Sequence, residues 1–310
     1  MDIKQMKALI GVEDYGGFSS AASAMETVQS NISTHVSKLE SELEVILVDR
    51  RTGTLTSEGL AVTKRARLIL QEMEAIQSDL HALKHDIRGN VRMGMIGTTA
   101  RWLIPILVPE LNKRHPNLHF VVSEGTTTSL EARLHNGTVD LALVNKPPYS
   151  EEFAFRSFFD EQYVLYINAS HPLASKQSVT IADLDQIDLI VPPKGIPFRD
   201  LLDTLAKRSK VDFNIIAEVD GVRLIASMAF DGYAPAIIPA TAVPHYLSDF
   251  AVVPVKDLPN RKIGIARRKR ALESAPMLSV LSLLDEVFSG DEPSRFPMPA
   301  GTRKISNNQT

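Results

Sequence analysis

The sequence predicts an α/β protein in three parts: a small helical head, one long helix, and a larger region of strands and helices in two lobes. Two short helices separated by a tight break fit residues 18–40. An apolar repeat of helical spacing then runs from Val62 to Ile87 without a Gly or Pro. After Arg88-Gly89-Asn90 the pattern changes to short apolar runs that alternate with amphipathic helices, which is typical of an α/β domain.

The composition excludes several classes of protein. The chain has 310 residues, 44% of them hydrophobic, which is enough to bury the cores of two or three domains. No apolar run reaches membrane-spanning length and the N-terminus lacks the pattern of a signal peptide, so we expect a cytoplasmic protein without a membrane partner. The sequence has no cysteine, which excludes disulfides, thiolate metal sites and a thiol redox switch.

The second short helix is predicted to have one apolar and one polar face. The residues expected to pack inward are Val28, Ile32, Val36, Leu39 and Leu43. The opposite face carries short or planar hydrogen-bonding side chains: Gln29, Ser30, Asn31, Ser33, Thr34, His35, Ser37 and Lys38. Such a face is more often plain solvated surface. Gln and Asn can nevertheless bond adenine bidentately, and Ser or Thr can bond a base edge or a phosphate.

The first short helix favours the reading of DNA over a solvated surface. Its expected buried stripe consists of Phe18, Ala21, Ala22 and Met25. The paired alanines allow the two helices to approach closely, as a helix-turn-helix requires. Ser19 is predicted to cap this helix, which leaves its amides free to face a phosphate.

These motifs resemble the winged helix-turn-helix of LysR-type transcriptional regulators. The segments that carry the resemblance are Phe18-Ser19 with Ala21-Ala22, Gln29 to Ser33, Lys38-Leu39-Glu40, Val48 to Arg51 and Leu55 to Gly59. The similarity continues to about Phe288. It implies a winged helix-turn-helix domain over 1–59, a dimerising linker helix over 60–88, and a two-lobed, periplasmic-binding-protein-like effector domain over 89–290. By this resemblance the DNA contacts are Ser19, Ser20, Gln29, Ser30, Asn31, Ser33, Thr34, His35, Lys38, Arg50 and Arg51.

The charge of the head and its departures from the family pattern limit what the resemblance implies. Residues 1–60 hold more acidic than basic side chains. Because salt screens a charge beyond roughly 8 Å, placement matters more than the sum, and the basic side chains end the reading helix and form the Arg50–Arg51 wing. We expect weak non-specific affinity. Val28 stands where the family usually has a capping Ser or Thr, and Ser20 and Thr34 stand where Arg is frequent, so the operator sequence stays open.

The long helix is predicted to run from an N-cap at Thr56 to about Asp86. Its apolar positions alternate at spacings of four and three: Val62, Ala66, Ile69, Met73, Ile76, Leu80, Leu83 and Ile87. So narrow a stripe favours pairing with a second chain over docking on the helix's own domain, and the predicted contacts are Ile69, Met73, Ile76, Leu80 and Leu83. Family resemblance implies a homotetramer built as a dimer of dimers. His81 and His85 lack a third ligand, so no metal is expected.

The remainder is predicted to form two lobes, each with a parallel sheet and helices on both faces. Lobe I is expected over about 89–165 and 267–290, lobe II over about 166–266, and a disordered tail over 291–310. The expected strands are 91–96, 118–124, 139–144, 187–191, 214–219, 234–238 and 262–266. The expected helices are 101–112, 129–136, 200–209, 222–230 and 276–288.

In such sheets ligands bind beyond the carboxyl ends of the strands. The residues in those loops are Thr98, Thr99, Thr126, Thr127, Pro193, Gly195 and Ile196. Resemblance implies that they line an effector cleft between the lobes, although each threonine fits a helix cap almost equally well.

The predicted function is a ligand-responsive, sequence-specific transcriptional regulator, in which a small molecule between the lobes alters the oligomer and the DNA bend. The expected partners are double-stranded promoter DNA, a small effector such as an organic acid, and RNA polymerase if the protein activates. No cofactor is expected, because Gly94 to Gly97 lacks the dinucleotide-binding spacing. The alternatives are a binding module without DNA activity, and an enzyme, for which no nucleophile elbow, zinc motif or phosphate loop occurs.

Overall fold

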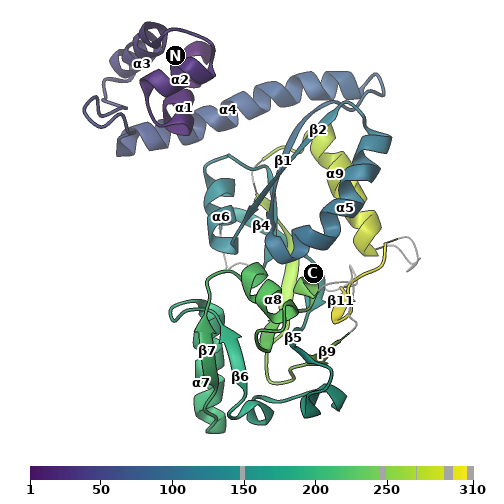
Figure 1. Ribbon diagram of the computed structural model, residues 1–310. Coiled ribbons are helices and arrows are strands. Elements are labelled where there is room, and N and C mark those ends of the chain that lie inside the picture. The colour runs from purple at the N-terminus through teal and green to yellow at the C-terminus, as the bar shows by residue number, and fades with distance from the viewer. Residues whose placement is uncertain (147–150, 244–248, 270, 290–295, 306–310) are drawn as a thin grey trace.

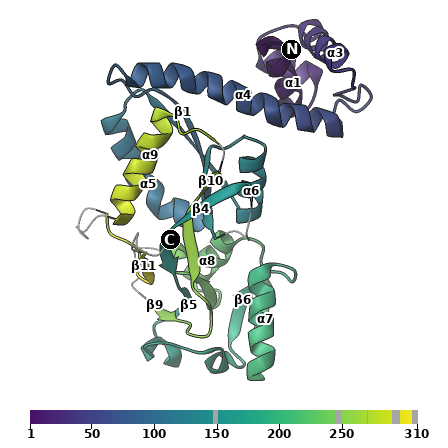
Figure 2. The ribbon, with the colours of Figure 1, turned by 180° about the vertical axis from the view of Figure 1, so that it is seen from behind.

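The computed structural model describes residues 1–146, 151–243, 249–269, 271–289 and 296–305. Figures 1 and 2 show a helical head, a long helix α4 and two lobes from opposite sides. The head lies at the N-terminal end of α4, lobe I lies along the C-terminal half of α4, and lobe II lies on the far side of lobe I (Figure 1). This arrangement confirms the predicted fold class.

The head consists of α1 (Ile3–Tyr15), α2 (Phe18–Ala24) and α3 (Gln29–Leu43). Asp2 caps α1 by accepting a hydrogen bond from the Gln5 amide at 2.9 Å. Between α2 and α3 the chain turns sharply, and Glu26 is left-handed there with φ 51°. After α3 a short wing closes at a bridge between Val48 and Leu55. The predicted inward residues that are buried are Ala21, Ala22, Ile32, Val36 and Leu39.

Four local predictions for the head are wrong. Val28 is exposed because it is the N-cap residue, outside the helical repeat, and Leu43 is exposed because the chain reverses directly after it. Met25 is exposed for the same reason at the end of α2. Ser19 does not cap α2, since Gly17 holds the N-cap position and Ser19 lies in the first turn.

Helix α4 (Ser57–Ala82) begins at the predicted cap. The Thr56 hydroxyl accepts a hydrogen bond from the Gly59 amide at 2.9 Å. The helix ends before the predicted Asp86, because tighter turns follow Ala82 and His85 is left-handed with φ 60°. Ile87 therefore lies outside the helix, and the apolar seam is shorter than predicted.

Lobe I contains a six-stranded mixed sheet. Its strands in spatial order are β11 (Thr302–Lys304), β4 (Phe153–Glu161), β10 (Arg261–Arg268), β3 (Leu141–Asn145), β1 (Gly89–Ile96) and β2 (Leu118–Gly125). Strands β1, β2 and β3 are parallel, whereas β10 is antiparallel to both its neighbours. The helices of this lobe are α5 (Gly97–Arg114), α6 (Thr127–His135) and α9 (Ala275–Ser289).

Lobe II contains a five-stranded mixed sheet. Its strands in spatial order are β7 (Asn214–Glu218), β6 (Asp188–Val191), β8 (Ala236–Pro239), β5 (Tyr163–Asn168) and β9 (Phe250–Pro254). Helix α7 (Pro197–Ser209) packs in one apolar core and α8 (Val222–Phe230) in another. The short 3₁₀ helices are η1 (Pro172–Ser175), η2 (Ile181–Leu184) and η3 (Ala240–Ala242).

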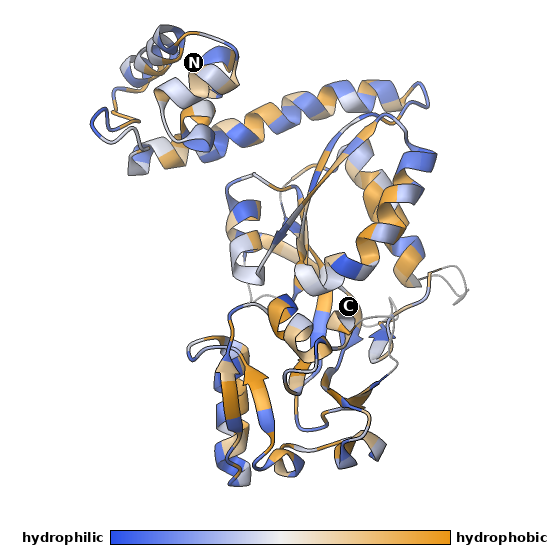
Figure 3. Cartoon of the chain, in the orientation of Figure 1, coloured by the Kyte–Doolittle hydropathy of each residue, from blue (hydrophilic) through white to orange (hydrophobic). Residues whose placement is uncertain are grey.

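The chain passes between the lobes at Gln162 and again over residues 255–260. The boundaries between the two lobes therefore lie a few residues away from the predicted ones. Both sheets are mixed rather than parallel as predicted. The strands next to the crossings, β10 in lobe I and β5 in lobe II, pair antiparallel with their neighbours. In Figure 3 the lobe II strands and α9 are mainly hydrophobic, whereas α4 alternates along its length.

The predicted disorder of the tail is wrong for the residues that the structure describes there. Phe296 is buried and Met298 packs against the lobe I core. Strand β11 pairs with β4, and the Gln162 amide donates to the Gly301 carbonyl at 3.0 Å. This short polar strand forms because β4 offers it an open edge. Residues 291–295 and 306–310 of the predicted tail lie outside the described residues.

Candidate functional site

Helix α3 presents the predicted polar face to solvent. Its apolar residues Ile32, Val36 and Leu39 are buried in the head. The exposed predicted contacts on this helix are Gln29, Ser30, Asn31, Thr34 and Lys38. Ser33 and His35 are half-buried, and Ser19 and Ser20 of α2 are exposed. The structure thus brings the predicted contacts of both helices to the surface of one small domain.

The polar side chains at the start of α3 are held by neighbours in the head. The Ser19 hydroxyl donates to Gln29 Oε1 at 3.0 Å, which joins α2 to α3. Asn31 Nδ2 donates to the Thr27 hydroxyl at 3.1 Å. Both bonds restrict the rotamers of amide side chains that point out of the protein, so less conformational entropy is lost when these amides bind a base edge.

The two wing arginines, both predicted to contact DNA, differ in position. Arg50 lies against α3, where its guanidinium donates to Glu40 at 2.6 Å, to Ser37 at 3.0 Å and to Ser33 at 3.3 Å. It also lies over the Phe18 ring, 4.6 Å from the centroid. Arg51 is exposed at the tip of the wing. Arg50 therefore fixes the wing to the reading helix, a role that the sequence alone did not reveal.

Glu40 organises the wing from the other side. Its Oε1 accepts hydrogen bonds from the Leu47 and Val48 amides at 2.9 and 3.1 Å, while its Oε2 pairs with Arg50. From the sequence, Glu40 is recognisable only as part of a family motif. Its structural role explains why a carboxylate is needed at the end of the Lys38-Leu39-Glu40 segment.

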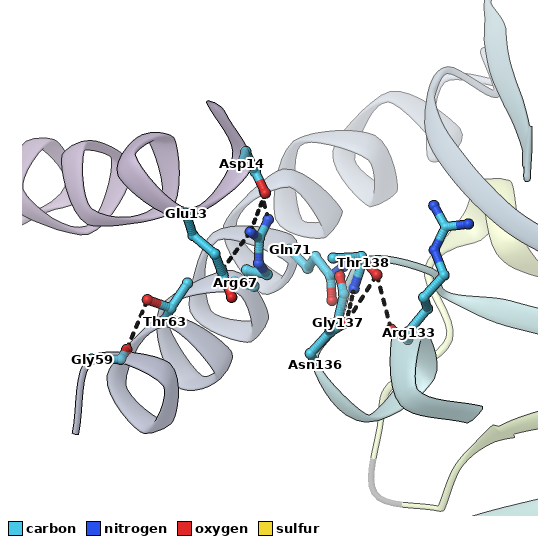
Figure 4. A network of polar contacts seen from close by, with 10 residues as sticks. All are labelled: Glu13, Asp14, Gly59, Thr63, Arg67, Gln71, Arg133, Asn136, Gly137 and Thr138. Carbon is cyan, nitrogen blue, oxygen red and sulfur yellow. Dashed lines mark hydrogen bonds and ion pairs between the residues drawn. The ribbon is translucent and has the colours of Figure 1, made fainter. Parts of the chain in front are cut away.

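Several acidic residues of the head are paired within the head or with α4. Glu13 and Asp14 of α1 pair with Arg67 of α4, the Glu13 contact measuring 2.8 Å (Figure 4). Glu42 pairs with the amino terminus and accepts from Gln5 Nε2 at 2.9 Å. These hydrogen bonds lower the pKa of Glu42 below its ordinary value. The excess of acidic residues therefore does not consist of free carboxylates on the α3 face.

The apolar seam of α4 is exposed over most of its length. Ala66 is buried, but Ile76 is 61% and Leu83 79% exposed. The other exposed seam residues are Ile69, Met73 and Leu80. A row of five exposed apolar side chains on one helix marks a surface that another chain would cover.

The carboxyl ends of β1, β2 and β3 face lobe II. Asn145 at the end of β3 pairs with Ile263, and Glu161 at the end of β4 pairs with Arg261, where the chain returns from lobe II. The first turns of α5 and α6 lie at the same edge, because these helices follow β1 and β2 directly. The structure thus brings the predicted threonine loops to the interlobe edge.

The threonines at this edge fall into two groups. Thr98 and Thr99 in the first turn of α5 are buried, and neither hydroxyl has a hydrogen-bond partner among the described residues. Thr126 instead caps α6 by accepting from the Ser129 amide at 3.2 Å, and Thr127 begins that helix. The capping alternative is therefore correct for Thr126, while Thr98 and Thr99 are left with unused hydrogen-bonding capacity.

In lobe II the loop from Pro193 to Ile196 connects β6 to α7. Gly195 is left-handed with φ 88°, which a side chain would oppose, and its amide donates to Asp200 at 3.3 Å. Ile196 is the N-cap of α7 and is exposed. The loop is therefore held in a defined turn by its glycine and by a carboxylate of the next helix.

Two contacts that the sequence did not reveal join the lobes at this edge, which, as the place of the predicted cleft, we call the interlobe opening. Glu124 at the end of β2 pairs with Arg223 of α8. A Cβ at Gly97 would lie 2.8 Å from the Glu124 carboxyl carbon, so the glycine makes room for this ion pair. Arg101 of α5 donates to the Ala242 carbonyl at 3.2 Å and lies 5.6 Å from the Phe230 ring centroid.

An open cavity of about 540 Å³ lies elsewhere, on lobe I between β4, β10 and α9. Phe155, Ile265 and Leu281 contribute apolar lining. Its arginines are paired at the rim, Arg156 with Asp285 at 2.5 Å and Arg267 with Glu273 at 2.6 Å. This cavity shares no residue with the predicted cleft, so its size says nothing about that site.

Within the described part of the chain, no three His, Asp or Glu side chains cluster as metal ligands would, and no helix is long and apolar enough to cross a membrane. His81 and His85 do not share a helix face, because α4 ends between them.

Comparisons with known proteins agree with this architecture. The family model described as bacterial regulatory helix-turn-helix protein, lysR family, matches residues 3–60, and that of the LysR substrate binding domain matches residues 84–289. The chain is 29% identical over 302 residues to a probable hydrogen peroxide-inducible genes activator of Mycobacterium leprae, covering 93% of this chain and 94% of that protein. It is 28% identical over 273 residues to the DNA-binding transcriptional dual regulator OxyR of Escherichia coli, covering 86% and 90%.

Solved structures of the same architecture align over nearly the whole chain. A full-length OxyR cysteine variant from Pseudomonas aeruginosa has a TM-score of 0.74 at 23% identity and covers 100% of this chain and 99% of its own. Full-length CbnR in complex with its target DNA has a TM-score of 0.63 at 22% identity, covering 92% and 98%. At these identities the likeness extends to the fold.

Proposed function

The chain belongs to the LysR family of DNA-binding transcriptional regulators, which are not enzymes, and we propose that it responds to a small molecule held between lobes I and II. In this proposal the bound effector changes how the lobes and the oligomer are arranged, and so changes the bend of the operator. Because residues 3–60 match a helix-turn-helix family of DNA-binding regulators, the alternative of a binding module without DNA activity is disfavoured.

For DNA reading we propose that α3 enters the major groove. Gln29, Ser30 and Asn31 would meet base edges, together with Ser33, Thr34 and His35. Ser19, Ser20, Lys38 and Arg51 would meet phosphates, and Arg50 would support the wing while it does so. The exposed face of α3 and the internal pairing of the acidic residues support this assignment.

For assembly we propose that two chains pair through the α4 seam. The exposed side chains from Ile69 to Leu83 support this proposal, because such a row is unfavourable in water and fits a second helix. Pairing would place two heads at a fixed separation, as an operator with two half-sites requires. A dimer of dimers is the assembly that we expect on DNA.

For the effector we propose a small organic acid. The amino ends of α5 and α6 both lie at the interlobe edge, where the helix dipoles favour an anion. The relatives named for hydrogen peroxide suggest another signal. A response through thiol oxidation needs a cysteine, however, and this chain has none.

The single observation that carries ligand binding is the pair of buried, unpartnered hydroxyls of Thr98 and Thr99 at the interlobe edge. A buried hydroxyl without a partner costs about 1–3 kcal/mol, and a ligand between the lobes would remove that cost. A ligand that bonds these hydroxyls would therefore stabilise the liganded state relative to the free protein.

The test is a DNase footprint on the DNA upstream of the protein's own gene and on the adjacent divergent promoter. We expect a long protected region with hypersensitive bands inside it, which report bending. Small carboxylic acids are then added one by one, and we expect one of them to shift those bands. Protection that no acid alters would contradict the effector proposal, whereas no protection even at low salt would contradict the reading face.

A further inference from the structure

We infer that helix α6 couples the interlobe opening to the DNA-binding head, because one end of α6 lies at that opening and the other holds α4. The inference rests on the proposed function, since it names the route by which an event between the lobes would reach the head. It concerns contacts within one chain and is independent of how chains assemble.

The first end of α6 belongs to the opening between the lobes. Thr126 caps the helix directly after β2. Glu124, two residues earlier, pairs with Arg223 of lobe II. A movement of lobe II relative to lobe I therefore acts on the residues that begin α6.

The second end of α6 contacts α4. Gly137, in the turn that follows the helix, accepts a hydrogen bond from Gln71 Nε2 at 2.6 Å (Figure 4). Gly137 is left-handed with φ 76°, and a Cβ there would lie 3.3 Å from Leu68 and 3.4 Å from Arg67. The turn thus packs directly on α4, without an intervening side chain of its own at that position.

Arg268 at the end of β10 fixes the same turn to the same glutamine. Its guanidinium donates to the Leu134 carbonyl at 2.9 Å, to the Val139 carbonyl at 3.2 Å and to Gln71 Oε1 at 3.1 Å. Both ends of the Gln71 amide are therefore engaged. At the surface, Lys64 Nζ lies 2.6 Å from His135 Nε2, the last residue of α6.

One turn before Gln71 on the same helix, Arg67 continues the route to the head. It bonds Glu13 and Asp14 at the end of α1, and its side chain is only 13% exposed (Figure 4). Because α1 packs against α3, a displacement of α4 relative to lobe I is also a displacement of the reading helix. The route consists of packed, hydrogen-bonded contacts throughout.

Between its two ends α6 packs on the lobe I sheet at two glycines. Leu130 packs over Gly94 and Gly125, where an added Cβ would lie 2.6 and 3.1 Å from its side chain. The Arg133 guanidinium of α6 also donates to the Ser123 hydroxyl of β2 at 3.1 Å, so α6 is joined to the strand that precedes it, and the hydrogen bonds at its ends connect both to the neighbouring elements. Shifts of about 1–2 Å are the usual scale of helix movement in switching proteins.

The experiment locks the opening and measures the response at α4. The chain has no cysteine, so Glu124→Cys with Arg223→Cys places the only two thiols across the opening, and a short bismaleimide joins them. Hydrogen exchange is then followed over residues 64–72 and 134–139 before and after cross-linking. The same variant is made with Gln71→Ala, and with Gln77→Ala as the matched control, an exposed glutamine on the same helix.

We expect cross-linking to slow exchange in both segments by about fivefold or more, the low end of coupling between distant sites. With Gln71→Ala the response of residues 64–72 should disappear, and with Gln77→Ala it should remain. An unchanged 64–72 segment in the parent, or an equal response with Gln71→Ala, overturns the inference. Thermal melts of all variants establish that they are folded.

A DNase footprint of the same samples separates this inference from the proposed function. A response of residues 64–72 without a change in the footprint supports the α6 route and contradicts regulation of DNA binding by the opening. A footprint that changes equally with and without Gln71→Ala supports the proposed regulation and overturns the α6 route.

Discussion

The reading face of α3 and the interlobe opening use polar side chains in opposite ways. On the head, Gln29 is bonded to Ser19 and Arg50 to Glu40, all within one small domain. At the opening, Thr98 and Thr99 have unpartnered hydroxyls, and the ion pair between Glu124 and Arg223 joins two separate lobes. The polar side chains of the head are therefore held in place before DNA binds. Those at the interlobe opening either lack a partner or connect the two lobes.

The difference follows from what each surface has to recognise. A DNA operator is rigid at the scale of a helix face, so rotamers fixed in advance reduce the entropy lost on binding. A small effector has few contacts to offer, and its effect depends on the difference in its affinity for two arrangements of the lobes. Hydroxyls without a hydrogen-bond partner and ion pairs between the lobes can produce such a difference in affinity, because a ligand or a lobe movement changes their contacts.

The largest expected effect comes from removing the organised face. Replacing Gln29 and Ser33 with alanine should weaken specific operator binding about 30-fold or more, since each base contact contributes about 1–3 kcal/mol. The protein should stay folded, because Gln29 is exposed and Ser33 is only half-buried. Binding is measured by titration of the footprinted operator, and Ser41→Ala on the same helix is the control. Equal operator affinity of the double variant and the parent would contradict the assignment of the α3 face as the DNA-reading surface.

The second prediction tests whether one head is sufficient. Ile76→Glu places a charge in the exposed seam of α4 and should convert the assembled protein to single chains. Separated heads should also lose most of their operator affinity, because two half-sites are no longer bound together. Sedimentation velocity measures the assembly, and Gln77→Glu on the neighbouring face is the control. An intact assembly with Ile76→Glu would remove the seam from the interface.

Two valine substitutions at the opening should have opposite signs. Thr99→Val removes a buried hydroxyl without a partner, so the free energy of unfolding should rise by about 1 kcal/mol. Thr126→Val removes the cap of α6 and should lower it by about 0.5–2 kcal/mol. Urea unfolding of both variants measures the pair. A loss of stability with Thr99→Val would mean that this hydroxyl is not an unsatisfied group.

The features that could be predicted from sequence are those with local causes. Thr56 begins α4 because a hydroxyl there can cap the amide three residues on. The helix predicted over 129–136 ends before Gly137, because glycine can adopt the left-handed conformation that closes the turn. The polar face of α3 was visible because helical spacing separates it from Ile32, Val36 and Leu39. These signals span a few residues, so one sequence contains them completely.

The features that were missed depend on distant partners. Strand β11 has little apolar character and forms only because β4 presents a free edge. The contact of Arg50 with Glu40 depends on how the wing folds back, and the pair of Glu124 with Arg223 joins residues 99 positions apart in two lobes. The site residues themselves stay predictions, since contacts with DNA or effector are measured only in a complex.

The smallest expected effect concerns the bridge between the lobes. Both partners of the Glu124–Arg223 pair are about half exposed, and pairs of this kind contribute less than about 1 kcal/mol. Arg223→Gln and Glu124→Gln should each lower the melting temperature by no more than about 4 °C, and the double variant should lower it no further than either single one. Raised salt should reduce the difference between parent and variants, because the pair is screened. Additive losses in this cycle would show that the two side chains act independently, and the lobes would then have to be held together by other contacts, such as that of Arg101 with Ala242.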